Sequence, residues 1–160
     1  MILTLKYFAL PVLLIFMSCD KVVQNVPTPV HPLSYYENIK TYSLPELFEL
    51  TNIDSLKCSD SLKDKNSSFI IKAYIFKDSI NSTQNIFFLF SEASDKAPRI
   101  IKCDISPDFL NIYVDMKAIF ASGNWQKIVV KGFLVEENVY SDTICKKEIA
   151  LTHIVEVGLP

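Results

Sequence analysis

The sequence predicts a mainly β domain with one or two short helices, and three observations support this. From residue 69 onward the chain is rich in Ile, Val, Phe and Tyr, the residues that favour strands. Strong helix-start signals occur at only two places, around Ser43 and Ser106. The 160 residues, less an N-terminal leader of 18, suffice for one domain with a real core.

Five strands are expected in the region that is rich in β-forming residues. They cover residues 69–77, 86–90, 99–105, 127–135 and 148–157, with a turn at 78–84 that makes the first two a hairpin. Gly132 predicts a bulge or bend in the fourth strand. In the fifth strand, alternation predicts one shared face for Ile149, Leu151, His153, Val155 and Val157.

Two helices are expected. Residues 43–52 begin with Ser43-Leu44-Pro45-Glu46, a capping box with proline near the helix start. The second begins at Ser106-Pro107-Asp108, and Gly123 would end it. The alternative for residues 111–114 is a strand, because Ile112, Tyr113 and Val114 are poor helix formers.

Three strands, a helix and two further strands form the element order of a five-stranded OB-fold barrel. The alternative is an immunoglobulin-like β-sandwich, which the helix signal and the low strand count disfavour. Three runs of the chain resemble the tRNA-anti-like OB-fold proteins found among secreted bacterial lipoproteins: residues 70–74, 128–134 and 149–155. In that family a glycine usually stands shortly before strand four, and here Gly123 is displaced from that place by Asn124-Trp125-Gln126. The resemblance implies the fold and not tRNA binding.

The N-terminus has the parts of an export signal: Lys6, an apolar run over residues 7–17, and the small residue Ser18. The run has eleven residues, whereas a membrane-spanning helix needs roughly 20. Phe16-Met17-Ser18-Cys19 resembles the lipobox of bacterial lipoproteins, although Phe16 and Met17 depart from its usual residues. This resemblance implies lipidation of Cys19 and a protein anchored in the cell envelope. The alternative is an ordinary cleaved signal peptide.

The expected organisation has four parts. Residues 1–18 form the signal peptide, 19–42 carry the lipidated cysteine and a tether, 43–68 form a lead-in helix and polar loop, and 69–160 form the OB-like domain. Pro27, Pro29 and Pro32 favour extended backbone in the tether.

The charge balance argues against a nucleic-acid partner. Without the leader, 15 basic and 18 acidic side chains remain, with the lysines scattered along the chain. A polyphosphate backbone is normally met by clustered positive charge. The expected partners are therefore the membrane, through the lipid anchor, and an envelope protein or saccharide.

With Cys19 lipidated, three cysteines remain: Cys58, Cys103 and Cys145. In an oxidising compartment one pair and one free thiol is the simplest arrangement. The first expectation is Cys103 with Cys145, because strands three and five of an OB fold are neighbours. Buried unpaired thiols are the alternative. No Cys-x-x-Cys or Cys/His spacing is present, so no metal or cofactor is expected.

Four Asp-Ser/Thr-aliphatic triplets resemble the O-glycosylation sequon of one bacterial phylum, with acceptors Ser55, Ser61, Ser79 and Thr143. Composition alone predicts about 0.5 such triplets. The alternative is ordinary Asp-Ser turn chemistry. Intact-mass analysis that shows no hexose on the native protein would contradict glycosylation.

No catalytic residue is expected. His153 is the one imidazole in the domain region, and its strand position favours a structural role. Trp125 with Phe120 and Phe133 would suit an aromatic binding platform, with core filling as the alternative. The sequence therefore predicts a non-enzymatic binding or assembly module. An enzyme with a dispersed site is the alternative, and a pocket with titratable groups around His153 would favour it.

Replacing Cys19 with serine should release the protein from membranes, because serine has no thiol to acylate and the lipid chains supply the membrane affinity. Fractionation of cells that express the full chain would measure this. A C19S protein that stays in the membrane fraction through its N-terminal helix would contradict the lipoprotein hypothesis.

Overall fold

The computed structural model describes residues 30–81, 83–105 and 116–160. Cys19, the leader and the predicted helix start at Ser106 lie outside these residues. The C-terminal part of the second predicted helix lies within the described residues and is helical. It finishes with the 3-10 helix η5 (Ile119–Ser122), which ends at Gly123. Within the described residues, no helix is long and apolar enough to cross a membrane.

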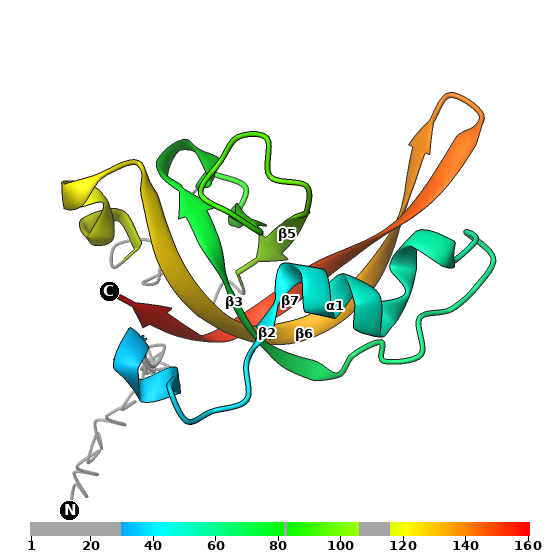
Figure 1. Ribbon diagram of the computed structural model, residues 1–160. Coiled ribbons are helices and arrows are strands. Elements are labelled where there is room, and N and C mark those ends of the chain that lie inside the picture. The colour runs from blue at the N-terminus through cyan, green and yellow to red at the C-terminus, as the bar shows by residue number, and fades with distance from the viewer. Residues whose placement is uncertain (1–29, 82, 106–115) are drawn as a thin grey trace, which may run out of the picture.

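Five strands pair in a closed ring, so the mainly β prediction is confirmed (Figure 1). The ring order is β3-β4-β5-β7-β6 and back to β3; β5 and β7 are parallel, and the other four pairs are antiparallel. Two short strands add to the outside of the ring: β1 on β7 and β2 on β3. The strands are β1 (Val30–Pro32), β2 (Tyr42–Ser43), β3 (Ser68–Phe76), β4 (Ile86–Phe90), β5 (Ile100–Asp104), β6 (Trp125–Ser141) and β7 (Ile144–Leu159).

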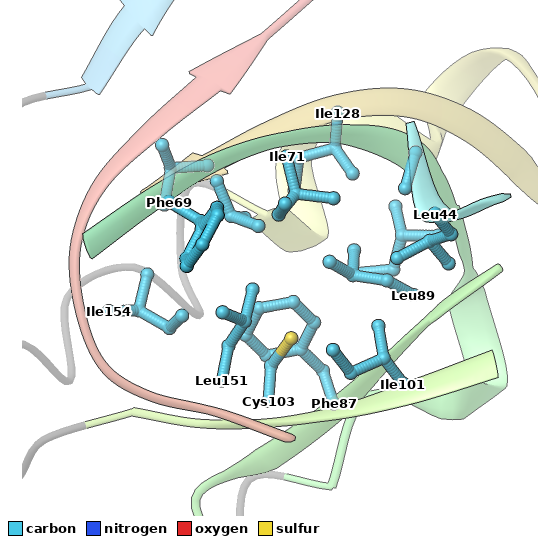
Figure 2. Packing of buried hydrophobic residues seen from close by; sticks show 14 of the residues in the cluster. Leu44, Phe69, Ile71, Phe87, Leu89, Ile101, Cys103, Ile128, Leu151 and Ile154 are labelled. Carbon is cyan, nitrogen blue, oxygen red and sulfur yellow. The ribbon is translucent and has the colours of Figure 1, made fainter. Parts of the chain in front are cut away.

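Alternation along the strands fills the inside of the ring. In β3 every second side chain, from Phe69 to Ile75, is buried. Side chains from all five ring strands meet there, together with Leu44 of α1 (Figure 2). Cys103 lies among them and is fully buried.

The first predicted helix is confirmed as α1 (Leu44–Thr51). Ser43 caps it: its Oγ accepts from the Glu46 N–H, and the Glu46 carboxylate accepts from the Ser43 N–H at 2.7 Å. The helix ends at Asn52, in the left-handed conformation. Leu44 and Leu47 enter the same core as the strands, so α1 packs on the strands, as expected for the lead-in helix.

Strands β6 and β7 extend well beyond the predicted 127–135 and 148–157. They continue as a paired hairpin to Ser141 and Ile144, turning at Asp142, where φ is 52°. We call residues 136–149 the arm; it projects from the ring, away from β1 and the C-terminus (Figure 1). Its charged residues have weak intrinsic strand preference, which is why the sequence did not predict it.

The predicted bulge at Gly132 is confirmed, but the extra residues lie on β7. Lys131 faces Glu156 and Phe133 faces Thr152, so residues 153–155 stand opposite Gly132 alone. A Cβ on Gly132 would lie 2.7 Å from Ile154 Cδ1. His153, at φ 49°, is exposed, and Ile154 is buried instead. The single apolar face predicted to contain His153 is therefore wrong, because the bulge shifts the alternation.

The tether predicted over residues 19–42 is wrong in its second half. β1 pairs with residues 157–159 of β7, and Tyr36 is buried with 1% of its surface exposed. The Tyr36 hydroxyl donates to Glu156 Oε1 at 2.7 Å. Burial and the neighbouring carboxylate of Glu156 raise the pKa of Tyr36. The domain therefore begins by Val30.

Tyr36 fits because residue 158 is glycine. A Cβ at Gly158 would overlap the Tyr36 ring and lie 3.1 Å from Val129 Cβ. Glycine there lets the N-terminal segment pack directly on the sheet.

Gly158→Ala should cost about 2 kcal/mol of unfolding free energy through overpacking, and Tyr36→Ala about 3 kcal/mol through the lost aromatic ring. Because the alanine methyl group collides with that ring, the double variant should lose less than the sum. Urea unfolding of the wild type, the two single variants and the double variant measures these free-energy losses. If the two losses of unfolding free energy simply add in the double variant, the proposed contact between residue 158 and the Tyr36 ring is contradicted.

Candidate functional site

A cleft opens where β5 and β7 separate. These strands pair at only two positions, Lys102 with Ala150 and Cys103 with Leu151. Toward its start, β7 leaves β5 and runs with β6 into the arm. The cleft in this angle has a volume of about 370 Å³.

Four parts of the chain line the cleft: the end of α1 with the residues after it, the loop before β5, the outer faces of β4 and β5, and the arm. The lining residues are Phe48, Ile53, Asp54, Phe88, Ala97, Pro98, Arg99, Ile100, Lys102, Glu137, Lys146, Lys147, Glu148 and Ile149. The lining contains both apolar and charged groups, so the cleft suits a ligand with both kinds of surface.

The charges at the cleft mouth are paired, one pair between β5 and β6 and one within β7. Lys102 Nζ of β5 donates to Glu137 Oε1 of β6 at 2.6 Å, and Lys146 lies 3.3 Å from Glu148. The hydrogen bond to Glu137 raises the pKa of Lys102 against the opposing effect of burial. These partly exposed pairs contribute little to stability, so a ligand can exchange them for its own contacts at small cost.

Arg99 forms the opposite wall. Its Nη1 donates to Asp54 Oδ1 at 3.0 Å, and its guanidinium lies 4.5 Å from the centre of the Phe48 ring. The ion pair and the cation–π contact hold the loop before β5 against α1.

Glu136 fixes the arm on the side away from the mouth. Its Oε2 accepts from the Leu62 N–H at 2.8 Å and from Lys147 Nζ at 3.1 Å, and its Oε1 accepts from Lys65 Nζ at 3.2 Å. The Lys147 side chain is only 2% exposed. Burial raises the pKa of Glu136, but the three donors outweigh it and hold the pKa below its ordinary value.

A disulfide between Cys58 and Cys145 ties the arm to the loop after α1, with the two Cα atoms 6.2 Å apart. The predicted Cys103–Cys145 pair is therefore wrong. Strands β5 and β7 are neighbours as expected, but Cys103 faces Leu151. Cys145 is six residues back along β7, about 20 Å away at 3.3 Å per residue. Cys103 is free, and burial raises the pKa of its thiol.

The four predicted glycan acceptors do not lie together. Ser55, Ser61 and Thr143 are exposed, Thr143 in the turn at the tip of the arm. Ser79 is half-buried, and its hydroxyl donates to the Phe76 carbonyl at 2.6 Å. Ser79 is therefore the least accessible acceptor of the four.

The predicted aromatic group around Trp125 has different members. Trp125 contacts Phe76 and Phe90, with ring centres 4.8 and 5.0 Å away. Phe120 is buried and Phe133 is 37% exposed. Within the part of the chain that the structure describes, neither of these rings packs against the Trp125 ring, and the aromatic cluster around Trp125 is formed by side chains of β3, β4 and β6.

His153 lies outside the cleft lining. Among residues 30–81, 83–105 and 116–160, no group of three or more His, Cys, Asp or Glu side chains is placed to hold a metal ion. The sequence analysis missed Arg99, Lys102 and Glu137. Two signals pointed to this region: Arg99 is the only arginine, and Lys146-Lys147-Glu148 is a charge run within an otherwise apolar stretch.

No protein-family model matches the chain, and no curated protein sequence matches it.

Glu136→Gln should lower the unfolding free energy at pH 7 by about 3 kcal/mol, since it leaves the buried Lys147 ammonium without its carboxylate. The folded pKa of Glu136 is below its ordinary value of 4.5. Its stabilisation is therefore complete above pH 4.5 and disappears as pH falls through the folded pKa, and the gap between wild type and variant should narrow there.

Urea unfolding between pH 7 and pH 3 measures this gap. Glu137→Gln is the matched control, because Glu137 is 39% exposed and pairs with Lys102, so its loss should be about 1 kcal/mol or less. Equal losses for the two variants, or a gap that does not change with pH, would contradict the role of Glu136.

Proposed function

We propose that this protein is a lipid-anchored lipoprotein of the bacterial cell envelope that binds a ligand in the cleft and catalyses no reaction. Its ring of strands would be an OB-like barrel. The observation that carries the proposal is the position of the cleft on the ring.

In OB folds, ligands bind over the second and third barrel strands and the loops beside them, including the loop between strands four and five. The second and third ring strands of this chain are β4 and β5, and the arm is the hairpin between its fourth and fifth ring strands. Phe88 of β4, Ile100 of β5 and Glu137 of the arm all line the cleft. The cleft therefore lies where an OB-like module would hold its ligand.

The Cys58–Cys145 disulfide supports an extracytoplasmic location independently of the N-terminal leader. Disulfides persist in oxidising compartments and are rare in the cytosol. The arm projects away from β1 (Figure 1). An anchor on Cys19 would thus hold the domain by the end opposite the arm and leave the cleft accessible. Glycans on exposed Ser55, Ser61 or Thr143 would suit this location.

The full chain can be tested by thermal shift against two probe panels, linear oligosaccharides and short peptides. Binding should raise the Tm, and Ile100→Lys should abolish the shift because Ile100 lines the cleft and is 45% exposed. Leu50→Lys is the matched control: Leu50 is 50% exposed and lies outside the lining. Mass spectrometry should recover the probe unchanged.

Binding that survives Ile100→Lys would place the ligand elsewhere and overturn the proposal. Conversion of a probe to a product would favour the alternative, an envelope enzyme with a dispersed site.

A further inference from the structure

We propose that the ligand of the cleft is an extended peptide, which adds to the sheet as a strand along the free edge of β7 at residues 144–149. This inference rests on the proposed function and names the class of ligand. The geometry of the strand edges carries it.

This edge has no strand partner because β5 reaches only Ala150 and Leu151 of β7. Continuing that register would put Ile100 opposite Glu148, but no pairing extends there. Within the residues that the structure describes, 144–149 pair with β6 on one side and with no strand on the other. Main-chain N–H and C=O groups on an open edge are ready to pair with an incoming extended chain.

The opposite edge of the hairpin is covered where the arm begins. The Leu134 N–H donates to the Ser67 carbonyl at 2.9 Å, and the Asn66 N–H donates to the Leu134 carbonyl at 2.7 Å. Further along β6, Asn138 Nδ2 donates to the Cys58 carbonyl at 3.4 Å. The loop after α1 thus occupies the β6 edge beside Leu134 and contacts the arm through the Asn138 side chain, whereas residues 146–149 of β7 line the cleft.

Charged side chains on β7 do not block this edge. Strand side chains stand roughly perpendicular to the sheet. Lys146 and Glu148 share one face and pair with each other at 3.3 Å, while Lys147 points to the other face and binds Glu136. The charges that often protect an exposed edge are therefore held by partners above and below the sheet.

Exposed apolar side chains flank the edge. Ile144 is 71% exposed and Val139 40%, and register places both on the same arm face as Lys146 and Glu148. Ile100, 45% exposed, lies across the cleft. Every second side chain of an added strand would face this set, so the peptide should carry apolar residues at alternate positions.

The arm is fixed before any ligand arrives. The Cys58–Cys145 disulfide and the Glu136 contacts hold it to the loop after α1. A strand edge held in place lowers the ordering cost of binding.

A displayed library of random dodecapeptides, panned on the full chain, tests the proposal. Enriched peptides should show alternating apolar residues. A synthetic enriched peptide should bind, and its copy with alternate main-chain nitrogens methylated should bind at least about tenfold more weakly, since methylation removes the N–H donors and keeps the side chains. Hydrogen exchange should slow at residues 144–149 when the peptide is bound.

Ile144→Lys should weaken the peptide about tenfold, and Leu50→Lys should leave it unchanged. The proposal is overturned if no peptide enriches, if methylation has no effect, or if protection appears elsewhere. Protection of residues 144–149 that rises with protein concentration without peptide would mean that a second copy occupies the edge, and also overturns it. If oligosaccharides bind in a manner sensitive to Ile100→Lys and peptides do not, only this inference fails and the proposed function stands.

Discussion

Two residue pairs between β5 and β7 close the ring, and most of the molecule depends on them. Lys102 with Ala150 and Cys103 with Leu151 join a strand from the middle of the chain to the last strand. Parallel pairing requires a long connection, and here residues 105–143, which include β6, provide it. The inner side chains at this seam, Cys103 and Leu151, are fully buried, so the core is sealed at its narrowest pairing.

The shortness of that seam also creates the cleft. A longer β5–β7 ladder would bring Ile100 and Glu148 together and close the space between them. Instead, β7 follows β6 into the arm, and the arm needs other support at that end. A covalent bond at Cys145 and a buried ion cluster at Glu136 supply it. In the chain-entropy model, a crosslink across 87 residues contributes about 4.6 kcal/mol.

The sequence predicted the fold better than it predicted the cleft. Strand existence followed from β-forming runs, and α1 followed from the Ser43–Glu46 capping box, because both signals are local. The limits of β6 and β7 did not follow, because residues 136–147 form strands only through pairing and the disulfide. The predicted face for His153 was wrong because one bulge shifts the alternation of inward and outward side chains along the strand. Lys102 and Glu137 meet, and Arg99 comes to line the same cleft, only in the folded chain; in the sequence each is an ordinary surface charge.

The Cys58–Cys145 disulfide constrains the order in which the domain can mature. If the chain is exported and Cys19 is lipidated as proposed, the cysteines left for disulfide bonding emerge in the order Cys58, Cys103 and Cys145. The first pairing on offer is thus Cys58 with Cys103, which would pull a core residue out to the loop after α1. Cys103 enters the core on β5, and the core closes only when Leu151 of β7 arrives. Before Leu151 arrives, a Cys58–Cys103 bond must either be avoided because oxidation is slow or be replaced by the native bond through thiol–disulfide exchange. Correct assembly is therefore tied to completion of the C-terminal strand.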